Sequence, residues 1–335
     1  MFKRPKVALV GGETLLGREI RDLAAETAPE IDLRLIAAEE GRAGLLTSLG
    51  DEPALVTNLD AENLSGVRAI ILAGSEASSR KALKLAAGEP RAAIIDLTFA
   101  AEDLPGARLR APVVEGEPDE EDASAHIVAH PAAIALALFL RRLHAHGPIR
   151  RSVIQILAPA SERGAEGIEE LQAQAVSLLS FKSLPKAVFD AQIAFTMLAR
   201  YGDEAPTPLD RTELRIERQL ADLLALPGEG EGAPMPSLRL IQAPVFHGYS
   251  FSAWVEMESA PGIEALESGL ACQWIDVRGA DAEPPNNVGN AGQSGIAVGG
   301  IAADRAHPDA CWFWVVADNL KLAAENAVAV ARGLV

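Results

Sequence analysis

Val7-Ala-Leu-Val-Gly-Gly-Glu-Thr-Leu-Leu-Gly17, near the start of this 335-residue chain, is the strongest indication of its fold. Residues 7–10 are an unbroken apolar run, which is typical of a strand buried on both faces of a parallel sheet. Residues 11–17 predict a glycine-rich turn, and residues 18–28 predict a helix that ends before Pro29. A strand, a glycine turn and a helix in this order can bind a pyrophosphate on backbone N–H groups at the helix start. A purely structural turn gives the same G-G-x-x-x-x-G pattern, so the interpretation depends on the strands that follow.

Those strands follow at the spacing of a doubly wound fold. Apolar runs predict strands at residues 32–38, 69–74 and 92–96, with a helix over residues 75–87. Alternating strands and helices with right-handed crossovers give a parallel sheet of the Rossmann type. Ligands bind such sheets beyond the carboxyl ends of the strands. The candidate cofactor-binding residues are therefore Gly11, Gly12, Thr14, Leu15, Leu16, Gly17, Ala38, Gly74 and Ser75.

The residues after the second predicted strand bear on which dinucleotide fits. Glu39 and Glu40 can accept a hydrogen bond from a ribose 2′-OH, which disfavours the phosphorylated ribose of NADP. Arg42 instead favours NADP, because a 2′-phosphate prefers an arginine pocket. An exposed charged loop explains the same residues equally well.

The second half of the chain opens on Ile127-Val-Ala-His-Pro-Ala-Ala-Ile-Ala-Leu-Ala-Leu-Phe-Leu140. This stretch predicts a short strand that passes through Pro131 into an Ala/Leu-rich helix. A helix N-terminus lowers the pKa of a thiol and so suits a catalytic cysteine, but this turn offers only Ala132 and Ala133.

Further strands are predicted at 151–157, 238–243, 250–257, 272–277 and 311–317, and further helices at 164–180, 211–224 and 318–334. This order predicts an α+β domain whose sheet is mixed or antiparallel. Trp312, Phe313 and Trp314 predict core or a subunit interface.

Composition narrows the class of protein. The formal net charge of −17 argues against nucleic-acid or anionic-membrane partners, which need clustered Lys and Arg. Cys272 and Cys311 are too few for a disulfide framework, so we expect a cytoplasmic protein. We expect neither a signal peptide nor a membrane span, because no apolar run is long enough. The acidic run at residues 117–122 predicts a solvated connector.

By this point the chain resembles the aspartate-semialdehyde dehydrogenase family over nearly its whole length. The matching segments, in family order, are Val10-Gly-Gly-Glu-Thr-Leu-Leu-Gly17, Ile95-Asp-Leu-Thr98, Ala111-Pro-Val-Val-Glu115, Gly167-Ile-Glu-Glu-Leu171, Asp190-Ala-Gln-Ile-Ala-Phe195, Ala243-Pro-Val-Phe-His-Gly-Tyr-Ser250 and Val315-Val-Ala-Asp-Asn-Leu-Lys321. The resemblance implies a Rossmann domain at 1–130 and 318–335 and a catalytic and dimerisation domain at 131–317. It also implies a homodimer or higher homo-oligomer, and it adds Asn319 to the cofactor-binding residues.

Active members of the family use NADP and a thioacyl intermediate to interconvert aspartyl phosphate and the semialdehyde. Here the resemblance places Ala133 at the nucleophile, Ala158 at a glutamine, Gln242 at a substrate-site arginine and Tyr249 at the histidine base. The phosphate-site arginine falls near residues 101–102, and among the matching ionic groups only Arg215 keeps its charge. Thr14 replaces the central glycine of the family's turn and adds a side chain where backbone approaches a pyrophosphate. We therefore expect weak NAD or NADP binding, NAD no weaker than NADP, and a cofactor that is not required.

Other groups are poor substitutes for the missing nucleophile and base. A free cysteine such as Cys272 or Cys311 is usually an inert small hydrophobe. His247 is a potential base, but it has no nucleophile to activate. His130 either binds an anion or caps the helix. A tyrosine such as Tyr249, with an ordinary pKa of ~10, is a poor base near neutral pH.

These residues leave three hypotheses. The first is a non-catalytic dimeric protein with a vestigial NAD(P) crevice, no metal site and an unknown small-molecule ligand. The second is an oxidoreductase that transfers hydride directly to or from another substrate. The third is a true semialdehyde dehydrogenase whose nucleophile lies elsewhere in the chain.

Overall fold

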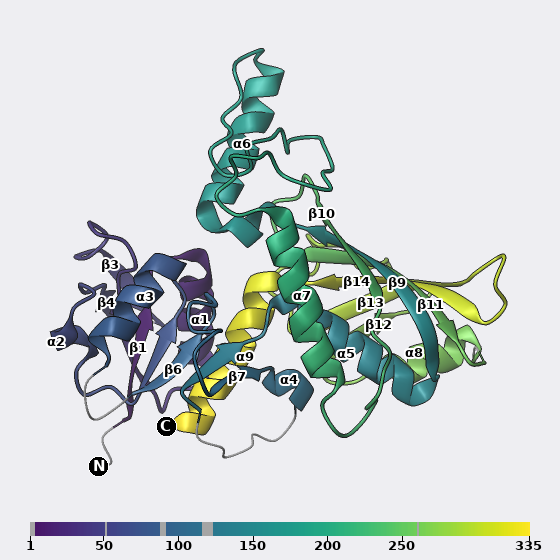
Figure 1. Cartoon of the computed structure of the whole chain (residues 1–335), viewed down its shortest axis with the longest axis horizontal. Helices are drawn as coiled ribbons and strands as arrows, with labels where there is room; N and C mark the ends of the chain where they lie inside the picture. Colours follow the sequence, from purple (N-terminus) through teal and green to yellow (C-terminus); the bar gives the residue numbers. More distant parts are fainter. Residues whose placement is uncertain (1–3, 51, 88–91, 116–122, 260) are drawn as a thin grey trace. The chain divides into compact units, whose positions relative to one another are not determined.

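The computed structural model describes residues 4–50, 52–87, 92–115, 123–259 and 261–335 (Figure 1). The predicted acidic connector at 117–122 lies outside these residues. The chain divides into two compact units, one made of residues 1–129 and 323–335 and the other of residues 130–322. Each unit has its own sheet and its own core, and each is described separately below.

The first unit contains a six-stranded parallel sheet in the order β2-β1-β5-β6-β8-β7. Its strands are β1 (Lys6–Val10), β2 (Asp32–Ile36), β5 (Ala69–Leu72), β6 (Ala93–Asp96), β7 (Ala107–Arg110) and β8 (Ala125–Val128). The central strands are continuous apolar runs because both faces of the sheet are covered. The predicted doubly wound parallel sheet is confirmed.

Two separate cores flank this sheet. One contains side chains of α1 (Leu15–Thr27) and of the final helix, α9 (Asn319–Leu334), packed on Val7, Leu9 and Ile71. The other, on Ala8, Val10 and Ile70, contains Leu64 of α2 (Ala61–Leu64) and Ala82 of α3 (Glu76–Leu85). A small hairpin, β3 (Leu46–Leu49) with β4 (Glu52–Leu55), and the short helix α4 (Pro112–Glu115) complete the unit.

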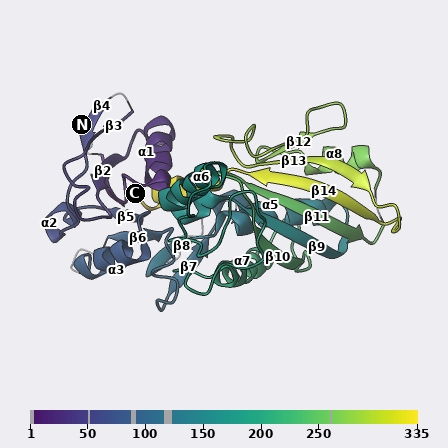
Figure 2. The same ribbon diagram turned by 90° about the horizontal axis from the view of Figure 1, so that it is seen from above.

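The second unit contains a mixed six-stranded sheet in the order β10-β9-β11-β14-β13-β12 (Figure 2). Its strands are β9 (Ile149–Ala158), β10 (Ser237–Gln242), β11 (Tyr249–Met257), β12 (Ile275–Arg278), β13 (Ile296–Ala303) and β14 (Ala310–Ala317). The two outer pairs are parallel and the central pairs antiparallel, as expected for the predicted mixed sheet. The α+β architecture of this part of the chain is therefore confirmed.

Helices cover one face of this mixed sheet. The central helix α5 (Pro131–His146) is buried almost throughout and packs on α7 (Leu209–Leu224) and α8 (Ile263–Leu270). The rings of Phe139 on α5 and Phe313 on β14 meet edge to face at 5.2 Å. The short helix η1 (Ala160–Arg163) leads into α6 (Gly164–Leu179), which projects from the rest of the unit (Figure 1).

Three details differ from the sequence predictions. The run predicted as a strand from residue 272 forms β12 only from Ile275 onward, because Cys272 and Ile275 form a tight bridge that turns the chain. Leu214, an apolar residue of the predicted helix at 211–224, is exposed. On α6 the buried face carries Glu170 and Gln174, and their side chains accept hydrogen bonds from backbone N–H groups of the loop at 188–194.

Within the described residues no helix is long and apolar enough to cross a membrane. In the same part of the chain no group of three or more His, Cys, Asp or Glu side chains is arranged to hold a metal ion.

Candidate functional site

The first candidate site is the glycine turn between β1 and α1 in the first unit. Gly11 has a φ of +94°, and a Cβ there would lie 2.6 Å from the backbone N of Gly74. A Cβ on Gly17 would meet the Gly11 carbonyl, and one on Gly74 would lie 2.5 Å from Ala38. Only glycine fits such approaches, so the ends of β1, β2 and β5 meet at this turn.

The remaining predicted residues of this turn surround the same strand ends. The Thr14 hydroxyl accepts from the Gly17 N–H and lies 2.9 Å from the carbonyl oxygens of Gly11 and Ala73. It is therefore the N-cap of α1, and Leu15 and Leu16 form the first turn of that helix. Ser75 caps α3 through its hydroxyl, in a reciprocal pair with Ser78. Gly12 packs beside Leu35 of β2.

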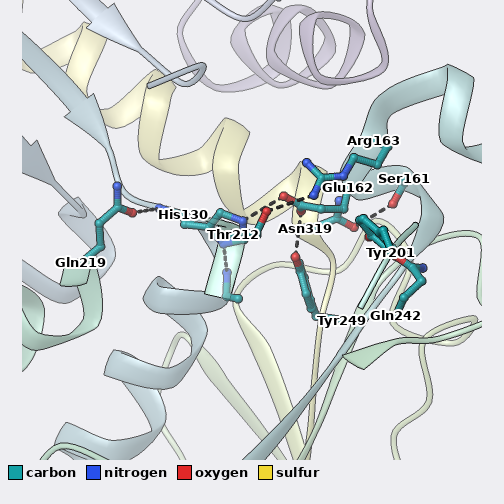
Figure 3. A network of polar contacts seen from close by, with 11 residues as sticks. His130, Ser161, Glu162, Arg163, Tyr201, Thr212, Gln219, Gln242, Tyr249 and Asn319 are labelled. Carbon is teal, nitrogen blue, oxygen red and sulfur yellow. Dashed lines mark hydrogen bonds and ion pairs between the residues drawn. The ribbon is translucent and has the colours of Figure 1, made fainter. Parts of the chain in front are cut away.

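The second candidate site is the N-terminus of α5 in the second unit (Figure 3). His130 is the N-cap, and its Nδ1 accepts from the Ala132 N–H at 3.2 Å. Its backbone N–H donates to Gln219 on α7 at 2.7 Å. Because Nδ1 is an acceptor, Nε2 carries the ring proton and faces the Glu162 carboxylate at 2.9 Å. His130 thus fixes the helix start, which is the capping alternative of the two open to it.

Glu162 is the centre of this network. Its second carboxylate oxygen accepts from the Tyr249 hydroxyl at 2.8 Å (Figure 3). Burial opposes ionisation of Glu162, but His130, the Arg163 guanidinium and the Tyr249 hydroxyl outweigh it and hold the pKa below its ordinary value. Burial and the Glu162 charge raise the pKa of Tyr249 well above the usual value. A carboxylate therefore lies against His130, the N-cap of the helix that carries the predicted nucleophile position, and Tyr249 donates a hydrogen bond to that carboxylate.

Tyr201 and Gln242 extend the network toward β9 and β10. The Tyr201 hydroxyl donates to Gln242 Oε1 at 2.6 Å, and Gln242 Nε2 donates to the carbonyls of Ala158 and Ala243. Arg163 lies over the Tyr201 ring at 5.5 Å and donates to Thr212 on α7. Burial raises the pKa of Tyr201 to about 12. The polar groups of Gln242 and Tyr201 are thus paired with each other or with backbone.

A second series of polar contacts holds the residues at the start of β11. His247 lies 3.1 Å from the Ser161 hydroxyl through Nδ1 and 2.9 Å from Asp318 through Nε2. Burial opposes ionisation of Asp318, but hydrogen bonds from His247 and from backbone N–H groups keep its pKa below the ordinary value. Asn319, a predicted cofactor residue, contacts the Ser161 hydroxyl and accepts from the Gly248 N–H. Ser161 is buried and shared between His247 and Asn319, so this chain positions residues rather than presenting a nucleophile.

Neither thiol lies near Tyr249. Cys311 pairs with Val255 in the register of β11 and β14, whereas Tyr249 pairs with Ala317. Six residues along a strand correspond to ~20 Å. Cys272 is exposed and forms a backbone bridge with Ile275, the first residue of β12. In the sheet, β12 is three strands away from β11, which begins at Tyr249, and three strand spacings correspond to ~14 Å. Burial, with the Asp304 charge, raises the pKa of Cys311.

Of the four positions that the resemblance assigned to the reaction, the structure therefore brings Ala158, Gln242 and Tyr249 into one region, and His130, the N-cap of the helix that carries Ala133, joins the same network. Ala133 lies in the first turn of α5, and Arg215 lies on the neighbouring helix α7. The sequence analysis missed Glu162, Arg163 and Tyr201, which connect these positions. A signal for the first two was available, because two charged residues stand only four and five positions after Ala158, the buried end of β9.

Comparisons with known proteins agree with this architecture. The model of the semialdehyde dehydrogenase dimerisation domain matches residues 140–322. A Pseudomonas aeruginosa protein named USG-1 protein homolog is 31% identical and is covered over 97% of its length by 98% of this chain. The aspartate-semialdehyde dehydrogenase of Rickettsia bellii is 28% identical, with 100% of this chain and 99% of that protein covered.

Solved structures give the same result. A probable aspartate-semialdehyde dehydrogenase from Pseudomonas aeruginosa has a TM-score of 0.83 at 29% identity, over 99% of this chain and 98% of that one. The Candida albicans aspartate semialdehyde dehydrogenase with NADP has a TM-score of 0.69 at 16% identity, over 98% of each chain, and shares the fold. Because the family model covers more than half of the chain and the first relative nearly all of it, the resemblance is confirmed: the chain belongs to the semialdehyde dehydrogenase family.

Proposed function

We propose that this protein is a non-catalytic homo-oligomeric member of its family with a vestigial NAD(P) crevice. One observation carries the proposal: alanine occupies position 133, and the polar side chains beside it satisfy one another around Glu162. Thioacyl chemistry needs a thiolate nucleophile, a base and cations that hold the substrate. In this network a carboxylate and two tyrosines of raised pKa take the place of those groups.

The positions of the thiols support the same conclusion. A nucleophile has to lie within a few ångströms of the reacting carbon. Cys311 is ~20 Å along the sheet from Tyr249, and Cys272 is three strands away. A cytoplasmic location is part of the proposal, because both cysteines are free.

The glycine turn of the first unit supports retention of a dinucleotide crevice. The close approaches at Gly11, Gly17 and Gly74 pack the glycine turn against the ends of β2 and β5 and the start of α1, the place where such folds bind a pyrophosphate. When bound, NAD or NADP would supply a hydride acceptor. We propose that binding is weak and that the fold does not require it.

Turnover of aspartate semialdehyde with phosphate and NADP tests the proposal directly. Loss of a nucleophile with its base typically costs on the order of 10⁶ in kcat. We expect purified protein to show no rate above the uncatalysed reaction, with a thiol-containing family member assayed beside it as the positive control. A rate within about tenfold of that control, lost on thiol alkylation, would show a true semialdehyde dehydrogenase. A cofactor-dependent rate that survives alkylation would indicate direct hydride transfer instead.

The uncovered face of the second sheet is the proposed homo-oligomer contact. Val153, Trp254 and Trp312 pair across β9, β11 and β14, and Val153 and Trp312 are 48% and 44% exposed. Asp304 accepts from the indole N–H groups of both tryptophans, which fixes their rings on this face. We propose a second copy as the occupant, because these residues fall inside the matched dimerisation domain.

Replacing Trp312 by aspartate is therefore expected to convert the assembly to monomer. A charge buried without a partner in an interface costs several kcal/mol. We do not expect an interface of typical size, ~800 Å² per partner, to form against that cost. Light scattering after gel filtration measures the mass. Leu214→Asp is the matched control, because Leu214 is equally exposed but lies on α7. An unchanged mass for Trp312→Asp, or a monomeric wild type, would contradict the proposed contact.

A further inference from the structure

Glu13 is a partly buried acidic residue whose carboxylate lies at the end of β2. It belongs to the glycine turn after β1, and its Oε1 accepts from the backbone N–H groups of Ala38 at 2.7 Å and Glu39 at 3.3 Å. Its Oε2 is buried and has no hydrogen-bond partner among the residues that the structure describes. One oxygen of this carboxylate thus holds the strand end, and the other is a buried acceptor that receives no hydrogen bond from the described residues.

The end of β2 is where a dinucleotide's adenosine ribose lies in doubly wound folds, and an acidic residue there accepts from the ribose hydroxyls. That position is Ala38 in this chain, which offers no acceptor. Glu39 and Glu40 are directed to solvent, with side chains 62% and 96% exposed. The sequence analysis left these two residues open between this role and an exposed charged loop, and the carboxylate of Glu13 lies closer to the strand end than either.

The charges around this point disfavour a 2′-phosphate on that ribose. Arg42 contacts Glu39 at 3.4 Å, and Lys81 contacts Glu40 at 3.5 Å, so each of these cations faces an acid of its own. The Glu13 carboxylate adds one further negative charge. It also occupies the two N–H groups that could otherwise bind an anion. A 2′-phosphate there would meet like charge at hydrogen-bond range, where electrostatic repulsion is strong.

We propose that Glu13 makes the crevice selective for a dinucleotide with an unphosphorylated adenosine ribose, accepting from its 2′-hydroxyl through Oε2. This inference rests on the dinucleotide crevice of the proposed function. It names the side chain that sets the preference between NAD and NADP, and it is independent of whether any chemistry follows binding.

Titration of the full-length protein with NADH and with NADPH, followed by nucleotide fluorescence or calorimetry, tests it. Wild type is expected to bind NADH more tightly than NADPH by about tenfold or more, the scale of one charge contact. Glu13→Gln keeps an oxygen for the Ala38 N–H but removes the charge, and should reduce that ratio by about tenfold, mainly by tighter NADPH binding. Glu40→Gln is the control, because its exposed charge should change the ratio by less than about twofold.

Three results would overturn the inference: NADPH bound by wild type at least as tightly as NADH, a ratio unchanged in a folded Glu13→Gln, or no binding of either dinucleotide. A melting curve shows whether the variant is folded, and Glu13→Asp, which retains the charge and shortens the side chain, should retain the NADH preference in the folded state. The first two results would overturn only this inference, whereas no binding of either dinucleotide would also remove the crevice of the proposed function. The absence of turnover is measured separately and does not depend on any of the three.

Discussion

Replacing Ala133 by cysteine is expected to leave aspartate semialdehyde turnover at least on the order of 10⁴-fold below that of a thiol-containing family member. The new thiol would lie in the first turn of α5, where the helix N-terminus favours a thiolate. The groups around it do not complete the site. The Glu162 carboxylate opposes a second negative charge, the raised pKa of Tyr249 makes it an unsuitable base, and Gln242 cannot neutralise a substrate carboxylate.

The measurement is steady-state NADPH formation, with thiol titration to show that the new cysteine is present and reduced. Val176→Cys on the exposed side of α6 is the matched control for an added thiol. The double variant Ala133→Cys with Tyr249→His adds a base and should raise the rate over the single variant, by a factor within the usual 10²–10⁴ for general-base catalysis. A single Ala133→Cys variant within about 100-fold of an active relative would show that the Glu162 network does not obstruct the reaction.

Replacing Glu162 by alanine is expected to lower the free energy of unfolding of the second unit by about 3 kcal/mol. The substitution leaves the Tyr249 hydroxyl and His130 Nε2 buried without their shared acceptor. Urea unfolding followed by tryptophan fluorescence isolates this unit, because Trp254, Trp274, Trp312 and Trp314 all lie in it. Glu169→Ala, at an exposed position of α6, is the control and should change stability by no more than about 0.5 kcal/mol. Equal losses in the two variants would mean that the network adds nothing to stability.

The same network predicts how acid affects stability. The pKa of Glu162 lies below its ordinary value of 4.5 in the folded protein, so the unfolded chain binds the proton more readily. The stabilisation by ionised Glu162 is therefore present above that ordinary value and is lost as pH falls through the folded pKa. Glu162→Gln cannot titrate, and its unfolding free energy should fall less steeply with acid than that of wild type. Parallel pH profiles would rule out this linkage.

Much of the fold could be predicted from the sequence, because continuous or periodic apolar patterns and glycine turns indicate local structure directly. The strands of the parallel sheet and the buried helix α5 are examples. The strand β13 was missed, since Gly299 and Gly300 interrupt its apolar pattern where its pairing with β14 shifts register. On α6, Glu170 and Gln174 are buried because they bind the backbone of a loop, which the spacing of apolar residues along a helix cannot predict.

The candidate site could be predicted only in part, for a related reason. The resemblance assigned the four positions from local motifs, and the structure brings Ala158, Gln242 and Tyr249 into one region. Tyr201 and Glu162 are far apart in sequence and belong to no motif, so their link to Tyr249 and Gln242 depends on tertiary packing. Glu13 was missed in the same way, because its side chain acts at the end of the next strand rather than in its own turn.

The division of α9 between the two units has a consequence for biosynthesis. Its residues from Ala323 onward fill the core beside β1 and β5, although more than 190 residues of the other unit separate them from β8. A ribosome therefore releases the whole mixed sheet before the parallel sheet receives its last helix. The domain that is translated first is completed last, and until then its apolar face is open to chaperones and to neighbouring nascent chains.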